Sequence, residues 1–173
     1  MKLVYTLRGA LAAIVIAAAP AVVAQVALPA GNTPYYPTGV GPAVSGTVNI
    51  GKLPEKAMKF IGTNFPQAVI TGIEEKFNSR TFEVDLNDGT DLEFNSAGDW
   101  TEVDAGHGTC LAPSLVKILL PANSYNEIVN MKLTNAVETV KRDSRFYKVE
   151  LRSPEYDDLR FNSAGVLVEI EMD

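Results

Sequence analysis

The chain has 173 residues, of which 15 are basic and 21 acidic, and the net charge is −6 at pH 7. This balance argues against a nucleic-acid ligand or an anionic lipid surface, because both require clustered Lys and Arg side chains. The single cysteine, Cys110, excludes an internal disulfide, so the stability of the chain must come from a packed core.

The first 24 residues have the pattern of a secretory signal peptide. Lys2 and Arg8 give a positive start, residues 9–19 form an uncharged apolar run, and small residues precede the bond after Ala24. A spanning helix needs about 20 apolar residues, so this run is too short for one. We therefore predict cleavage after Ala24 and a bacterial periplasmic or secreted protein without a transmembrane segment in its mature part. A retained membrane anchor is the alternative.

Residues 25–51 are rich in Pro, Gly and small residues and show no hydrophobic period, which predicts a flexible lead-in. Without Lys2 and Arg8, the mature chain keeps 13 basic and 21 acidic residues, a net charge of −8. The excess is uneven, with 4 basic and 11 acidic residues in 53–105 but 8 and 10 in 111–173. A partner is therefore expected to distinguish the two halves.

An internal repeat organises the rest of the chain. The peptide Phe-Asn-Ser-Ala-Gly occurs at 94–98 and again at 161–165, and the pair Leu-Pro occurs at 53–54 and at 120–121. Each repeat predicts one helix followed by about four antiparallel strands. The predicted units are residues 52–105 and, with a linker at its start, residues 106–173. We expect an α+β fold with both helices on one face of either two short sheets or one continuous sheet.

Local patterns give the elements of these units. In the first unit, Leu-Pro and apolar residues at helical spacing predict a helix that ends before Pro66. Four strands follow; they are predicted over 68–75, 80–86, 91–94 and 99–103, with Asn87-Asp88-Gly89 as a tight turn. In the second unit, the alternation from Val166 to Met172 predicts the last strand.

The first unit also predicts a charged surface. Alternation places Glu83 and Asp85 on the solvent side of the sheet, and Trp100 either joins them together with Glu102 or covers an edge of the core. Like charges on neighbouring strands reduce stability, and Trp is frequent at the centre of protein interfaces. A solvated sheet face without a partner is the alternative. The residues predicted to bind a partner are Trp100, Asp88, Glu83, Asp85 and Glu93.

The acidic residues around Gly89 suggest a calcium loop, but the position of this glycine and the absence of a Glu at the end depart from the EF-hand pattern. A hairpin turn explains Asp85, Asp88 and Asp91 without a metal. We therefore predict no metal and no cofactor, and we keep binding of a small ligand or of Ca²⁺ as the alternative function.

His107 and Cys110 are the residue types of a thiol nucleophile with its base, or of a metal site. Their Gly-rich loop supplies only Asp104 as a further ligand, so we expect a connection with an incidental thiol. A dimer linked through Cys110 is the alternative. No Ser-His-Asp order and no phosphate-binding Gly loop occurs, and we predict that the protein is not an enzyme.

Several of these peptides together resemble a known family. Leu-Pro, a helix ending in Asn-Phe-Pro, Phe-Glu-Val-Asp-Leu-Asn-Asp-Gly-Thr and Phe-Asn-Ser-Ala-Gly-Asp-Trp are similar to the PepSY-like, β-lactamase-inhibitor-like proteins that bacteria export. The resemblance extends over residues 50–173 and is weaker in the second copy, which lacks Asn-Phe-Pro and the Asp-Gly turn. It implies helices packed on an antiparallel sheet. By fold analogy, it also implies a protein that binds another protein, such as a hydrolase of the envelope or the medium.

Overall fold

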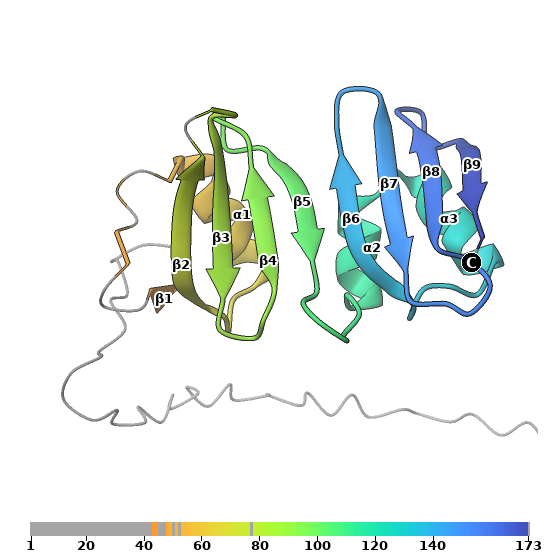
Figure 1. Cartoon of the computed structure of the whole chain (residues 1–173), viewed down its shortest axis with the longest axis horizontal. Coiled ribbons are helices and arrows are strands. Elements are labelled where there is room, and N and C mark those ends of the chain that lie inside the picture. The colour runs from red at the N-terminus through yellow and green to blue at the C-terminus, as the bar shows by residue number, and fades with distance from the viewer. Residues whose placement is uncertain (1–42, 45–47, 50, 52, 77, 173) are drawn as a thin grey trace, which may run out of the picture.

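The computed structural model describes residues 43–44, 48–49, 51, 53–76 and 78–172. The predicted signal peptide and most of the predicted lead-in lie outside these residues. The described chain forms nine strands in one sheet and three helices, and Figure 1 shows the helices behind the sheet. The α+β class is therefore confirmed. None of the helices in the described ranges has the length and apolarity that a membrane crossing requires.

The first helix, α1 (Glu55–Asn64), begins where the sequence predicted it. Pro54 directly precedes it, and Glu55 lies in its first turn, where a negative charge suits the positive end of the helix dipole. Ala57 and Ile61 lie one turn apart and are fully buried. Four strands follow: β2 (Val69–Lys76), β3 (Thr81–Leu86), β4 (Asp91–Phe94) and β5 (Trp100–Asp104).

The second half contains one helix more than predicted. α2 (Pro113–Leu119) lies in the segment that was predicted as a linker, and it begins with a proline in its first turn. Leu115, Val116 and Leu119 are buried at helical spacing, so the signal was present but short. The remaining elements are α3 (Ala122–Asn130), β6 (Val137–Arg142), β7 (Phe146–Leu151), β8 (Asp158–Asn162) and β9 (Leu167–Glu171).

The strands follow one another across the sheet in chain order, and β2 to β9 are antiparallel neighbours. Strand β5 pairs with β6 through the three pairs Glu102–Lys141, Val103–Val140 and Asp104–Thr139, so the two halves share one continuous sheet. At the other edge, β1 (Ala43–Val44) pairs in parallel with β2, and Val44 is buried. A two-residue strand is too short to show a period, and the sequence did not predict it.

The core lies between the helices and the face of the sheet that they cover. Its centre consists of apolar side chains that alternate with charged ones along the strands, together with buried residues from each of the three helices. The largest fully buried side chains are those of Phe94, Phe161, Ile61, Ile70, Leu92, Ile128, Leu159, Val84, Val103, Val116, Val137 and Val140.

The repeated peptide forms the turn between β4 and β5 and again between β8 and β9, and each turn packs against the start of a helix. Asn95 Oδ1 accepts hydrogen bonds from the backbone N–H groups of Ala97 (3.0 Å) and Asp99 (2.9 Å). A Cβ atom on Gly98 would lie 2.8 Å from Pro54 Cβ, closer than carbon atoms normally approach. The glycine of the motif is therefore required by the Leu-Pro pair 44 residues earlier in the chain.

The second copy of the peptide makes the same contacts. Asn162 Oδ1 accepts hydrogen bonds from the N–H groups of Ala164 and Val166, both at 3.0 Å. A Cβ atom on Gly165 would lie 3.0 Å from Pro121 Cβ at the start of α3.

Gly98→Ala is expected to destabilise the fold more than Gly89→Ala. Both glycines have a positive φ, +79° and +91°, so alanine at either position is strained by about 1–2 kcal/mol. Only at position 98 does the new Cβ meet neighbouring atoms; nothing lies within 4 Å of it at position 89. Urea titration should therefore show a further loss of about 1–3 kcal/mol in the free energy of unfolding for Gly98→Ala. Equal losses in the two variants would show that a Cβ atom at position 98 does not clash with the start of α1.

Candidate functional site

The open face of the sheet, opposite the helices, carries two rows of mostly polar side chains that run across the strands. They alternate with the buried residues of the same strands. The first row, in strand order, is Glu74, Glu83, Glu93, Glu102, Lys141, Lys148, Arg160 and Glu169. The second row is Asp85, Asp91, Asp104, Thr139, Glu150, Asp158 and Glu171.

We call the carboxylates of β2, β3 and β4 on this side the acidic face; they are Glu74, Glu83, Asp85, Asp91 and Glu93. Glu83 lies directly opposite Glu93 in the β3–β4 register, and Asp85 lies opposite Asp91. Lys76 reaches Glu83, with 2.9 Å between Nζ and Oε2. Among the described residues, Asp85, Asp91 and Glu93 form no ion pair. Like charges in such cross-strand positions repel, so the acidic face lowers the stability of the isolated protein.

The pKa of Asp91 is raised above its usual value. Partial burial raises it first, and the negative charges of Asp85, Asp104 and Glu83 raise it further. An ionised Asp91 is therefore less favourable in the folded chain than in water. The predicted site residues Glu83, Asp85 and Glu93 thus do lie together on the open face.

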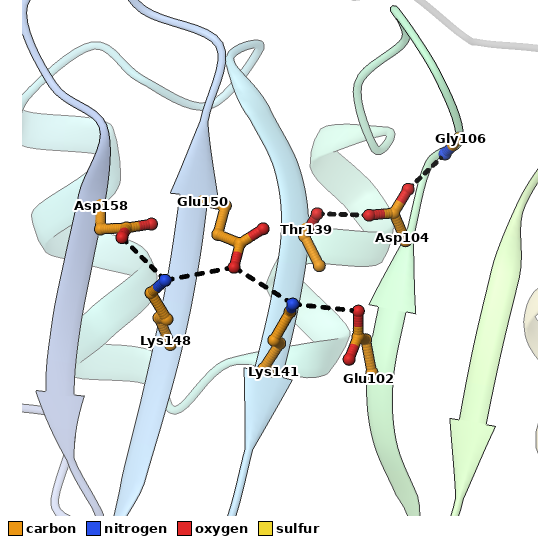
Figure 2. Close-up of polar contacts among 8 residues, drawn as sticks. All are labelled: Glu102, Asp104, Gly106, Thr139, Lys141, Lys148, Glu150 and Asp158. Atoms are coloured by element: carbon orange, nitrogen blue, oxygen red, sulfur yellow. Dashed lines mark hydrogen bonds and ion pairs between the residues drawn. The ribbon is translucent and has the colours of Figure 1, made fainter. Parts of the chain in front are cut away.

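At the seam between the halves, the charges change sign and form a chain of ion pairs (Figure 2). Lys141 Nζ lies 3.2 Å from both Glu102 Oε1 and Glu150 Oε1. Lys148 Nζ lies 3.2 Å from the same Glu150 oxygen and 2.8 Å from Asp158 Oδ2. This series of ion pairs crosses β5, β6, β7 and β8, so it connects the two halves of the sheet on the open face.

Two groups in this chain show how burial and pairing compete. Burial raises the pKa of Glu102 and Lys141 lowers it, while the negative charges of Glu93 and Glu150 raise it again, so that the pKa stays above its usual value. Burial alone would lower the pKa of Lys141, but its hydrogen bonds to Glu102 and Glu150 outweigh burial and raise it. Lys141 is shared by two carboxylates, and both raise its pKa.

The loop after β5 is fixed from the same face. Asp104 Oδ1 accepts a hydrogen bond from the Gly106 N–H at 2.7 Å, and the Thr139 hydroxyl donates to Asp104 Oδ2 at 2.6 Å (Figure 2). Both oxygens of Asp104 are thus engaged inside the protein. This carboxylate contributes to the structure of the seam more than to a free surface.

Trp100 does not join the acidic face, and the expectation that it lies there is wrong. It is 8% exposed and lies on the helix-covered side of the sheet. Its ring stacks on Phe60 at a centroid distance of 6.3 Å, and the Arg142 guanidinium carbon lies 4.0 Å from its centroid. Arg142 Nε also donates a hydrogen bond to the Trp100 carbonyl oxygen at 2.8 Å. The alternative given by the sequence, a Trp at an edge of the core, describes its surroundings.

A β-bulge explains why simple alternation failed for Trp100. Glu93 pairs with Glu102, but the next residue, Phe94, pairs with Trp100, so Thr101 is an extra residue in β5. One extra residue moves a side chain to the opposite face. The register of β8 and β9 shifts at the corresponding place, and there Leu167 lies opposite Phe161 and packs against the core.

The other predicted positions have structural roles or lie apart. Asp88 is exposed in the β3–β4 turn, and its Oδ1 accepts a hydrogen bond from the Thr90 N–H at 3.0 Å, so it stabilises the turn. Cys110 is a free, half-buried thiol, and His107 is exposed in the loop before α2. No three His, Cys, Asp or Glu side chains of the described ranges are placed to hold a metal ion together.

The sequence did not predict the series of ion pairs formed by Lys141 and Lys148 on the open face. Alternation in β7 indicates that Lys148 and Glu150 face solvent, but it does not say which charges they meet. Lys141 contacts Glu102 only because β5 pairs with β6 in this register. No local pattern carries that information.

The fold and the open face define a class: α+β proteins with one charged, uncovered sheet face and no buried catalytic constellation among the described residues. Residues 80–169 match the model of the family described as "Putative beta-lactamase-inhibitor-like, PepSY-like". The match covers more than half of the chain, and the protein belongs to this family, as the resemblance in its sequence implied. No curated protein matches the chain.

Solved structures support the fold. A "putative calcium-regulated periplasmic protein" of Bacteroides thetaiotaomicron is 25% identical with a TM-score of 0.58, and the alignment covers 71% of this chain and 93% of that one. A "putative periplasmic protein of unknown function" from Bacteroides vulgatus is 23% identical, also with a TM-score of 0.58. That alignment covers 71% of this chain and 94% of the other. The chain is a bacterial periplasmic or secreted protein, as predicted.

Asp91→Asn and Asp99→Asn are expected to change stability in opposite directions. The raised pKa of Asp91 means that its ionisation opposes folding once the pH rises through about 4. Because Asp91 is exposed and solvent screens the repulsion, Asp91→Asn should stabilise by only about 0.2–0.5 kcal/mol at pH 7. A hydrogen bond from Lys56, aided by the charge of Arg142, lowers the pKa of Asp99. Its carboxylate stabilises the fold above about pH 4, and this contribution is lost as the pH falls.

Urea midpoints at pH 7 and at about pH 3 would measure both effects. At pH 7 Asp91→Asn should have a higher midpoint than the parent protein, and Asp99→Asn a lower one. Both differences should shrink at the lower pH, because Asp91 is then protonated and the contribution of Asp99 is lost progressively as the pH falls through its lowered pKa. A lower midpoint for Asp91→Asn at pH 7 would contradict the repulsion that we describe.

Proposed function

We propose that this protein is a non-enzymatic, exported binding module whose acidic face contacts a basic surface of another protein. The observation that carries the proposal is the direct opposition of Glu83 to Glu93 and of Asp85 to Asp91 on an uncovered sheet face. Lys76 is the only cation paired with these four carboxylates in the described chain. A basic partner surface would relieve their repulsion on binding.

The family description supports an inhibitor, and a hydrolase of the envelope or the medium is the partner that we propose. The mechanism is steric: a rigid sheet face covers a site on the partner, and charge complementarity gives the orientation and the rate of association. The proposed contact residues are Glu83, Asp85 and Glu93, with Asp88 in the turn beside them. Trp100 supports this face from below by filling the core behind β5.

We also propose that residues 52–105 and 106–173 are two copies of one unit, preceded by a signal peptide over 1–24 and a lead-in over 25–51. The two Leu-Pro and Phe-Asn-Ser-Ala-Gly contacts support a duplication, because the same pair of peptides meets in each half. In this arrangement the copies share a scaffold but have diverged in charge. Only the first copy keeps an acidic surface.

Residues 25–173, immobilised and exposed to envelope and culture extracts of the host, should retain a specific protein. The triple variant Glu83→Gln, Asp85→Asn and Glu93→Gln is expected to lose at least about 90% of that protein, because three charge–charge contacts are removed. The matched control is Glu55→Gln, Glu127→Gln and Glu155→Gln, which removes the same charge outside the open face. Mass spectrometry would compare the captured proteins.

Equal capture by the two triple variants would reject the acidic face as the contact surface. Retention of no specific protein by the parent chain would reject the binding module itself. A captured hydrolase should then be assayed for inhibition by the parent protein, with the acidic-face variant as the reference.

Binding of Ca²⁺ is the second candidate, and one arrangement favours it. Asp85, Asp91 and Asp104 lie opposite one another on three neighbouring strands, and a structural neighbour is described as calcium-regulated. Two observations weigh against it: both Asp104 oxygens are engaged inside the protein, and no three carboxylates of the described residues are placed to hold a metal ion together.

A calcium titration of the melting temperature tests this second candidate. A ligand that binds only the folded state must raise the melting temperature as its concentration rises. We expect an increase with Ca²⁺ that exceeds the increase with Mg²⁺ and disappears in Asp91→Asn. An unchanged melting temperature at millimolar Ca²⁺ would exclude a calcium site of functional affinity.

A further inference from the structure

Exposed apolar side chains gather at the last strand of the sheet. The described chain has six large apolar residues that are exposed, and four of them lie on β9 or next to its ends: Val166 (54%), Val168 (52%), Ile170 (44%) and Met172 (66%). Single exposed apolar residues are common on soluble proteins, whereas a cluster of them marks an interaction site. Here the cluster follows one strand.

Strand β9 is also an edge of the sheet. It pairs only with β8 in the described chain, so the backbone N–H and C=O groups along its other side have no strand partner there. Such an edge is a template for a further strand unless charge or a covering segment blocks it. At the opposite edge, β1 covers part of β2, and the exposed side chains there include Glu74 and Lys76. The apolar cluster is specific to β9.

The two sides of β9 differ in chemistry. Ile170 lies opposite buried Leu159, on the side that the helices cover. Glu169 lies opposite Arg160 on the open face and forms an exposed ion pair with it, with 3.2 Å between Arg160 Nη1 and Glu169 Oε2. Glu169 and Glu171 line a cavity of about 340 Å³, together with Phe146, Asp158 and the cations Lys148 and Arg160. An added strand would therefore meet apolar side chains on one side and carboxylates on the other.

We propose that the free edge of β9 binds an extended segment of a partner protein in which apolar and basic residues alternate. The segment adds a tenth strand, its apolar residues pack beside Ile170 and Met172, and its Lys or Arg residues face Glu169 and Glu171. Main-chain hydrogen bonds supply affinity in this mode of recognition, and the alternating side chains supply specificity. The inference rests on the proposed binding function and names a second contact with the partner, apart from the acidic face.

Charge argues against a second copy of the same chain as the occupant. An antiparallel pair of two β9 strands, with their open faces on the same side, would bring the carboxylates of Glu169 and Glu171 of one copy beside those of the other. Like charges in this position are destabilising, and the whole chain carries a net charge of −6. A basic segment meets neither obstacle.

The test uses the purified protein and a fluorescent eight-residue peptide of alternating Lys and Val, followed by fluorescence anisotropy. Saturable binding is expected. Binding should be abolished when alternate peptide amides are N-methylated, because those amides form the hydrogen bonds between strands. Affinity should fall at least about fivefold when Glu replaces Lys in the peptide. Glu169→Lys with Glu171→Lys should reverse the preference between the two peptides. Glu55→Lys with Glu155→Lys, the same charge change elsewhere, should leave it unchanged.

Hydrogen exchange would locate the site, and protection of residues 167–172 by the Lys-Val peptide is expected. Absent binding, binding that survives N-methylation, or protection confined to other strands would overturn the proposal. A dimer that is detected by sedimentation and is lost in Val168→Pro would also overturn the proposal, because it would show that β9 pairs with a second copy of the chain. The acidic-face triple variant should bind the peptide normally, so failure here leaves the capture experiment on the acidic face as an independent result.

Discussion

The pairing of β5 with β6 is the constraint on which the rest of the structure depends. Three residue pairs join a half of the sheet covered by α1 to a half covered by α2 and α3. Units of this length are only marginally stable alone, and the shared sheet joins the two halves in one body. The same register aligns Glu102 with Lys141, and thereby sets where the open face changes from acidic to mixed charge.

The charged side chains of the open face have different neighbours in the two halves of the sheet. In the second half, Lys141 and Lys148 are shared among three carboxylates, so the charges there stabilise the sheet. In the first half, like charges oppose each other, and after partial burial they raise the pKa of Asp91 further. Retaining such repulsion on an uncovered face is understandable if a partner surface neutralises it, and this supports a binding protein over a purely structural one.

Much of the fold could be predicted from the sequence because its signals are local. Alternation in residues 81–86, the Leu-Pro helix starts and the Phe-Asn-Ser-Ala-Gly turns each depend on a few neighbouring residues. Trp100 was misplaced because one extra residue, Thr101, reverses the alternation, and a bulge leaves no mark in hydrophobicity. The site was harder: Glu83, Asp85 and Glu93 follow from alternation, whereas the partner of Lys141 depends on pairing between segments about 40 residues apart.

The strict chain order of the strands has a consequence for how the molecule assembles. Most strands pair with the one that directly follows them across a short turn, so few contacts require distant parts of the chain to meet. Low contact order of this kind gives fast folding, since little loop entropy is lost before each contact forms. The pairing of β5 with β6, across the segment that contains α2 and α3, joins the strand neighbours that are farthest apart in the sequence. Each half can thus form from its own hairpins, and the two halves join last.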